Sequence, residues 1–270
     1  KKIIGQAKFL RALYYFTLMR FYDHIVVIRE TDNLNEETPS NQGTDDAAWA
    51  LIEEDLQYAE SVLPVRWGDS DGGRATKGAA MAMLSKVYLT QAGWPWNKAG
   101  FWEKAASKTT EIINNEGAFG YGLEDNFRRI FDVTNEHGKE YIFDVEYQTN
   151  INGQDIPALS GMRGYNIKKT DGWSSFISTP EFYKSYEIGD KRLSTTFVTE
   201  FTDMKNGKHY IYDPDNVTEP SFPLCHFAKY LDPNDNQSTK AGDYGCNWKV
   251  VRYADVLMMQ SEAYCEMNRI

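Results

Sequence analysis

Four tryptophans lie in segments rich in turn-forming residues rather than on helical stripes. Trp67 stands in a loop with glycines and aspartates, Trp94 and Trp96 flank a proline, and Trp173 follows a glycine. An indole face beside polar groups can hold the apolar face and the hydroxyls of a sugar, and the same geometry can anchor a peptide side chain. The alternative is that each ring folds back as a plug over the core. We expect at least one of the four to contact a ligand.

Catalytic motifs are missing from the sequence. It contains no HExxH, no GxSxG, no P-loop and no dinucleotide-binding glycine pattern. The four histidines have no ligand-like neighbour at i+2 or i+4, which favours ordinary structural roles. Paired carboxylates for glycosidic cleavage need a spatial separation that a sequence does not show, so a glycan-cleaving enzyme remains an alternative.

One polar segment has the spacing of a calcium loop. Asp232, Asn234 and Asn236 place oxygen side chains at alternate positions, and Asp243 stands where a twelve-residue loop has its last ligand. However, Gln237 occupies the position where the sharp turn needs glycine. We therefore favour a solvated polar turn, with calcium as the alternative, and expect no other cofactor.

Charge and composition exclude several classes of protein. The 270 residues include 39 acidic and 29 basic side chains, for a net charge of −10. No run of Lys and Arg exceeds two residues, so a nucleic-acid partner is not expected. A hydrophobic content of 41% indicates a globular chain. No apolar run reaches the ~18 residues that a membrane span needs. The three cysteines show no CxxC spacing and are interpreted as buried small hydrophobes.

Apolar residues recurring every three or four positions predict five helices. They cover approximately residues 3–21, 44–63, 80–88, 102–112 and 254–265. The stripe of the first consists of Ile3, Ala7, Leu10, Tyr14, Leu18 and Phe21, and that of the fifth of Ala254, Leu257, Ser261 and Cys265. A short connection predicts that the third and fourth helices form a hairpin. Periodicity runs from near the first residue to the last, so we expect the chain to be truncated at both ends.

The middle of the chain follows a different pattern. Residues 140–147 combine β-branched and aromatic side chains and predict a strand. Residues 150–246 are rich in Gly, Asn, Asp, Pro and Ser, with few long periodic segments. A loop tract of this length is usually functional or an insertion. We therefore expect a helical scaffold that carries a large irregular segment in which binding takes place.

Several segments form an ordered set along the chain: residues 6–16, 52–59, 73–80 with 87–89, 140–143, 179–181, 190–192 and 251–263. Taken together, this set resembles the SusD/RagB family of Bacteroidetes nutrient-binding lipoproteins. The segment from Gly73 to Ala80 is the most specific of these. Because most matched residues belong to the expected helices, they indicate the scaffold rather than the ligand.

The resemblance implies a fold, a function and a location. The fold would be mainly α, a right-handed superhelix of tetratricopeptide-like helix pairs with a loop-rich segment and a few short strands. Residues 1–270 would form one domain, with a scaffold at 1–120 and 247–270 and a ligand-binding segment at about 121–246. The protein would bind oligosaccharides without catalysis, or peptides in the RagB manner, and pass them to a SusC-like TonB-dependent transporter. It would be lipid-anchored at the outer face of the outer membrane, through an anchor absent from this chain.

The resemblance also implies which residues bind the ligand. In the family they come between the short strand and an Asp-x-Arg element, here residues 148–190. Trp173 is the only tryptophan there and the first candidate, with Tyr165, Asn166 and Arg163 beside it in sequence. The candidates of second rank are Trp67, Trp94 and Trp96.

Overall fold

A computed structural model describes the chain in two compact units. It describes residues 1–22, 24–29, 45–68, 71–164, 167, 172–216, 218, 221–222, 224–231, 240 and 242–268. Unit 1 comprises Lys1–Leu123, Lys139–Phe143 and Val251–Ile270, and unit 2 comprises Glu124–Gly138 and Asp144–Val250. Each unit is described by itself below, and a single domain spanning residues 1–270 stays a prediction.

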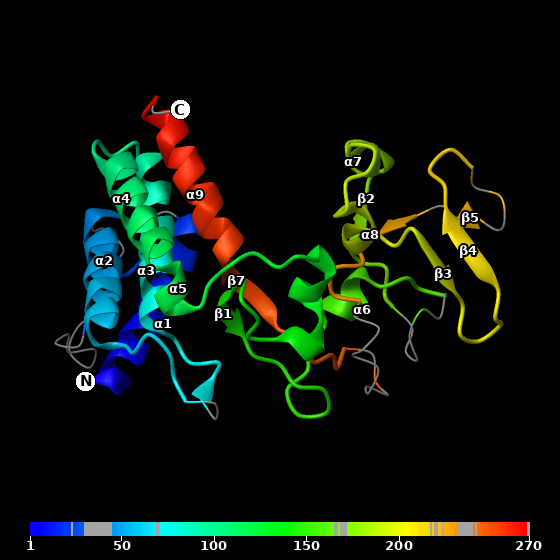
Figure 1. Cartoon of the computed structure of the whole chain (residues 1–270), viewed down its shortest axis with the longest axis horizontal. Helices are drawn as coiled ribbons and strands as arrows, with labels where there is room; N and C mark the ends of the chain where they lie inside the picture. The colour runs from blue at the N-terminus through cyan, green and yellow to red at the C-terminus, as the bar shows by residue number, and fades with distance from the viewer. Residues whose placement is uncertain are drawn as a thin grey trace. The chain divides into compact units, whose positions relative to one another are not determined.

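Unit 1 is built from helices (Figure 1). They are α1 (Lys2–Phe21), α2 (Asp45–Val62), α3 (Lys77–Ala92), α4 (Phe101–Asn114), α5 (Glu116–Phe119) and α9 (Tyr253–Glu266). Helix α1 packs on α2, α2 on α3 and α3 on α4, and α9 packs on α4 and also contacts α3. All five predicted helices are confirmed, as is the hairpin of α3 and α4. The mainly α class is confirmed, and the stacking is consistent with the predicted superhelix.

Local signals in the sequence explain where these helices begin and end. The Thr76 hydroxyl accepts a hydrogen bond from the Ala79 amide at 3.1 Å and so caps α3. Helix α4 ends at Asn114, because the chain breaks at Asn115 and makes the extra turn α5. Gly120 ends that turn in the left-handed conformation, which glycine adopts without strain.

The core of unit 1 lies between α1, α2 and α3. Phe16 packs against the fully buried Trp49, with ring centroids 6.2 Å apart. Asp55 of α2 is buried and receives Lys8 Nζ at 2.7 Å and Arg11 Nε at 2.6 Å. A buried carboxylate needs such partners, so two cations of α1 fix the pairing of the two helices.

The apolar stripes predicted for the first and fifth helices do not form the buried faces of these helices, so this prediction is wrong. In α1 the buried positions are Gly5, Phe9, Ala12, Phe16 and Met19, whereas the stripe residue Tyr14 is 64% exposed. In α9 the packed residues are Tyr253, Val256, Met259 and Ala263. Because α1 carries apolar side chains on both faces, periodicity alone does not tell which face packs. Cys265 of α9 is exposed, so the expected burial holds for Cys225 and Cys246 but not for it.

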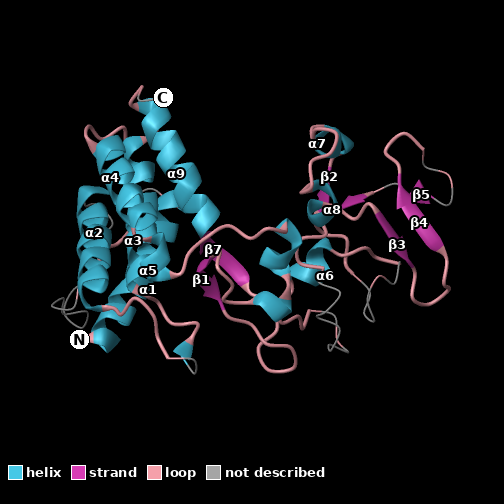
Figure 2. Cartoon of the chain, viewed as in Figure 1, coloured by secondary structure: helices cyan, strands magenta, loops and turns pink. Residues whose placement is uncertain are grey.

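The predicted strand is confirmed as β1 (Tyr141–Val145), which pairs with β7 (Trp248–Arg252). Unit 2 otherwise consists of short elements joined by loops (Figure 2). They are the 3-10 turns η2 (Phe127–Phe131) and η3 (Val133–Asn135), helices α6 (Ile156–Ser160), α7 (Pro180–Lys184) and α8 (Leu193–Thr196), and strands β2 (Ile177–Ser178), β3 (Glu200–Thr202), β4 (His209–Tyr212), β5 (Ser221–Phe222) and β6 (Cys225–His226). β2 pairs antiparallel with β6. The third sheet has the order β3-β4-β5, antiparallel and then parallel.

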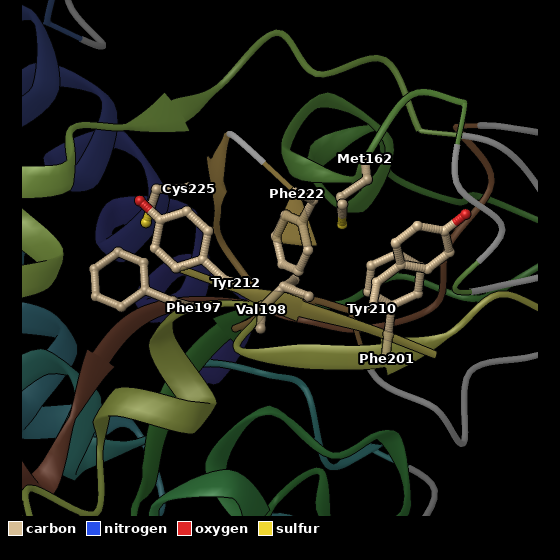
Figure 3. Packing of buried hydrophobic residues seen from close by; sticks show 9 residues of the cluster. Met162, Phe197, Val198, Phe201, Tyr210, Tyr212, Phe222 and Cys225 are labelled. Atoms are coloured by element: carbon tan, nitrogen blue, oxygen red, sulfur yellow. The ribbon is translucent and has the colours of Figure 1, made fainter. Parts of the chain in front are cut away.

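Aromatic side chains form the core of unit 2 (Figure 3). Phe222 is fully buried, with Phe201 and Tyr212 packed at centroid distances of 5.5 and 5.3 Å. Phe197 is edge-on to Tyr183 at 5.4 Å. Part of the chain's aromatic content, which is 14% of its residues, therefore fills this core. Across the part of the chain that the structure describes, no helix is long and apolar enough to cross a membrane.

Candidate ligand-binding site

The loop that follows β1 is held by the segment that precedes β7. Gln154 and Tyr244 form an antiparallel bridge, with the Gln154 amide donating to the Tyr244 carbonyl at 2.9 Å. The Asp243 carboxylate accepts the Asn150 amide at 3.0 Å. Gly153 permits this approach, because a Cβ there would lie 2.7 Å from the Asp243 carbonyl carbon. Two segments distant in sequence thus form one framework.

Hydrogen bonds fix the backbone of Trp173 and of the residues beside it. The Trp173 amide donates to the Ala158 carbonyl in α6, at 2.7 Å. The next amide, of Ser174, donates to the Gly161 carbonyl at 2.9 Å. The Ser174 hydroxyl accepts the Arg163 amide at 2.8 Å. The backbone is therefore fixed while the residue remains 42% exposed, so its ring is a candidate stacking surface.

A carboxylate borders the same indole. Gly242, with φ of +81°, lies between the Trp173 ring and the side chain of Asp155. A Cβ at Gly242 would lie 3.3 Å from Trp173 Cη2 and would clash with Asp155 Oδ1. Asp155 and Arg163 are both exposed. The described part of the site therefore combines an exposed ring, an acceptor carboxylate and a guanidinium on one unit.

The structure places the second-rank tryptophans in unit 1, each in a different environment. Trp67 donates from Nε1 to the Ala75 carbonyl at 2.8 Å, and Lys2 Nζ lies 5.6 Å from its ring centroid. Trp96 packs edge-on against the buried Trp49 at 5.0 Å. Trp94 is 86% exposed. Trp67 and Trp96 thus make packing contacts, whereas Trp94 is open to solvent.

Several predicted residues lie outside the described part of the chain. They are Tyr165 and Asn166 of the ligand site, and Asp232, Asn234 and Asn236 of the calcium pattern. Within the described ranges, no group of three or more His, Cys, Asp or Glu side chains could hold a metal ion.

The sequence did not point to Asp155 and Gly242. Asp155 precedes a short helix and looks like an ordinary cap, and Gly242 lies in a polar tract far from Trp173 in sequence. No local pattern joins them, because a long-range bridge brings them together. A second exposed tryptophan of unit 2, Trp248, was also not predicted; its ring stacks on Tyr230 at 5.5 Å.

A partly buried polar cluster lies beside the segment that follows β1, where the Asn247 side chain accepts the Tyr147 amide. The Asn247 amide donates to Glu136 Oε1 at 3.0 Å, and Lys249 Nζ lies 2.6 Å from Asp144 Oδ2. His137 Nε2 lies 2.9 Å from Glu146 Oε1. Burial raises the pKa of Glu136 to about 7 and that of Asp144 to about 6. The hydrogen bond to Glu146 raises the pKa of His137.

Comparison with known families agrees with this architecture. A family model described as starch-binding and associating with the outer membrane matches residues 1–89, and the SusD family model matches residues 139–269. The chain belongs to the SusD/RagB family. The two matches fall on the first helices of the SusD-like scaffold and on the stretch from β1 to α9, which includes Trp173.

Individual SusD-like relatives match nearly the whole chain. A SusD-like protein of Formosa agariphila, P2, is 30% identical over 98% of this chain and 52% of its own length. A laminarin-binding SusD-like protein of known structure is 28% identical, with a TM-score of 0.75, over 96% of this chain and 59% of that one. A SusD superfamily protein from Parabacteroides distasonis is 27% identical, with a TM-score of 0.76, over 99% of this chain and 56% of that one. The chain thus spans about half the length of the SusD-like proteins it matches.

Proposed function

We propose that the chain carries the binding segment of a non-catalytic SusD-like protein that captures oligosaccharides. The observation that carries this proposal is the indole of Trp173, which is open to solvent on a backbone fixed by hydrogen bonds. A pre-formed aromatic face binds with little loss of conformational entropy. The polar side chains of Asp155 and Arg163 supply hydrogen-bonding groups near it. One structurally similar relative is named as laminarin-binding, which supports a glycan ligand.

The experiment that tests this proposal compares ligand classes. The purified chain is applied to a glycan array and to a peptide library, and hits are measured by calorimetry. Binding to oligosaccharides and not to peptides is the expected result. Peptide binding alone would favour the RagB-like alternative and contradict the leading proposal.

Capture is separated from cleavage by product analysis. The chain is incubated with the polysaccharides that it binds, and the products are separated by chromatography. We expect no products. Reproducible turnover that one carboxylate substitution abolishes would replace the binding proposal by a glycan-cleaving enzyme.

The proposed setting is the cell surface, where the full-length protein is lipid-anchored to the outer membrane and hands its ligand to a SusC-like TonB-dependent transporter. The family description of association with the outer membrane supports this location. A pull-down of the full-length protein from native outer membranes should recover a large β-barrel partner. Recovery of the protein alone would contradict the partnership.

A further inference from the structure

The carboxylate of Asp155 is placed unusually for its position in the chain. Asp155 precedes the first turn of α6, where aspartate commonly accepts a hydrogen bond from the helix backbone, yet its side chain makes no such bond. The carboxylate has no hydrogen-bond or ion-pair partner among the described residues, although it lies beside the backbone of Gly242. An exposed acceptor without a local partner is available to a ligand.

The side chain of Asp155 also lies close to the ring of Trp173. The Asp155 carboxylate and the Trp173 Cη2 edge approach the same methyl-sized position above Gly242. A side chain at Gly242 would clash with the carboxylate and crowd the indole, so the glycine allows the two groups to lie close together. A molecule stacked on the indole would therefore have its rim within reach of the carboxylate.

The carboxylate of Asp243, in the loop framework, differs from that of Asp155 because it already has a hydrogen-bond partner in the protein. Asp243 accepts the Asn150 amide with both oxygens, at 3.0 and 3.1 Å. It adds negative charge near the site, and its oxygens already accept a hydrogen bond from the loop. Arg163 is an exposed positive residue of the same unit, and its backbone amide donates to the Ser174 hydroxyl.

We propose that Asp155 is the hydrogen-bond acceptor of the Trp173 site, and that the site therefore selects an uncharged sugar residue. This inference rests on the proposed function and narrows its ligand class. An ionised carboxylate accepts hydrogen bonds and donates none, so its two oxygens suit two neighbouring hydroxyls of one sugar ring. A sugar that carries a carboxylate or a sulfate at the rim beside Asp155 would meet charge of the same sign there.

The test compares Asp155→Asn with a matched surface variant. Glu187→Gln removes one negative charge from an exposed position of the same unit, so it controls for net charge. Wild type and both variants are titrated with laminarin-derived and xyloglucan oligosaccharides as neutral probes, and with alginate and galacturonate oligosaccharides as acidic probes. Circular dichroism and thermal melting confirm that each variant is folded.

We expect wild type to bind one or more neutral probes and to bind acidic ones more weakly. Asp155→Asn should weaken binding of the neutral probe tenfold or more and should reduce the discrimination against acidic probes, while Glu187→Gln stays within twofold of wild type. If Asp155→Asn also stays within twofold while Trp173→Ala loses binding, the role of Asp155 is wrong and the proposed function stands. If wild type prefers an acidic probe and this binding depends on Trp173, the proposed selectivity for uncharged sugars is wrong and the proposed function stands. If wild type binds no glycan, the proposed function fails and this inference falls with it.

Discussion

Gly172 and Gly161 pack backbone against backbone at the base of the Trp173 turn. A Cβ at Gly172 would lie 2.7 Å from the Gly161 Cα, and the Gly172 amide donates to the Met162 carbonyl at 3.1 Å. The neighbouring Ser174 amide donates to Gly161 itself. Two glycines therefore allow the close approach that fixes the residue carrying the indole.

This contact predicts the effect of Gly172→Ala. Overpacking at a site lined by backbone should lower the free energy of unfolding by about 1–3 kcal/mol. Oligosaccharide binding should weaken as well, because the Trp173 backbone must shift. Gly117→Ala is the control, since a Cβ there meets nothing within 4 Å. Equal thermal melting of the two variants would contradict the account of this contact.

Gly242→Ala tests the space between Trp173 and Asp155. The new methyl group would enter the position that both groups border, and the positive φ of the residue adds strain. We expect binding to fall more than stability does. Calorimetric titration and thermal melting of the same preparation separate the two effects. Unchanged affinity in a folded variant would show that binding does not depend on the close approach of Asp155 and Trp173.

The two faces of α1 predict opposite outcomes for substitution. Phe9 is fully buried and edge-on to Phe143 at 4.7 Å, so Phe9→Ala should lower the free energy of unfolding by about 3–5 kcal/mol. Tyr14 is exposed, and Tyr14→Ala should change it by about 0.5 kcal/mol or less. Urea unfolding of the two variants measures both values. A large loss for Tyr14→Ala would show that the outer face of α1 is packed in solution.

Glu136 predicts a pH dependence of stability. Burial raises its pKa from the ordinary 4.5 to about 7 in the folded protein. Between these values the folded state binds more protons than the unfolded state, so the contribution of Glu136 to stability falls as the pH rises. His137, whose pKa is raised by Glu146, acts in the same direction above its ordinary 6.5. Glu136→Gln should therefore show a smaller loss of stability than wild type between about pH 4.5 and 7. A pH profile parallel to that of wild type would contradict this.

The calcium pattern predicts the result of metal removal. We favour a solvated turn for the segment with Asp232, Asn234 and Asn236, so EDTA should leave oligosaccharide affinity and thermal melting unchanged. Titration before and after chelation measures both. A loss that added calcium restores, but magnesium does not, would instead support the calcium loop.

Local sequence patterns predicted the helices because each carries its own periodicity and end signals, as Thr76 does for α3. They did not predict which face of α1 packs, because Phe9 and Tyr14 lie on opposite faces of a helix that is apolar on both. Trp173 could be proposed from its exposed, glycine-rich context and from the family resemblance. Its neighbour Asp155 could not, because the bridge between Gln154 and Tyr244 depends on the tertiary fold.

The most direct test of the account is the affinity of Trp173→Ala for the oligosaccharide that the wild-type chain binds, measured by isothermal titration calorimetry. Loss of the stacking ring should cost about 2 kcal/mol, roughly a thirtyfold loss of affinity. Ile188→Ala removes another exposed apolar side chain of unit 2 and should bind as wild type does. A Trp173→Ala protein that folds normally and binds within about twofold of wild type would contradict the site assignment.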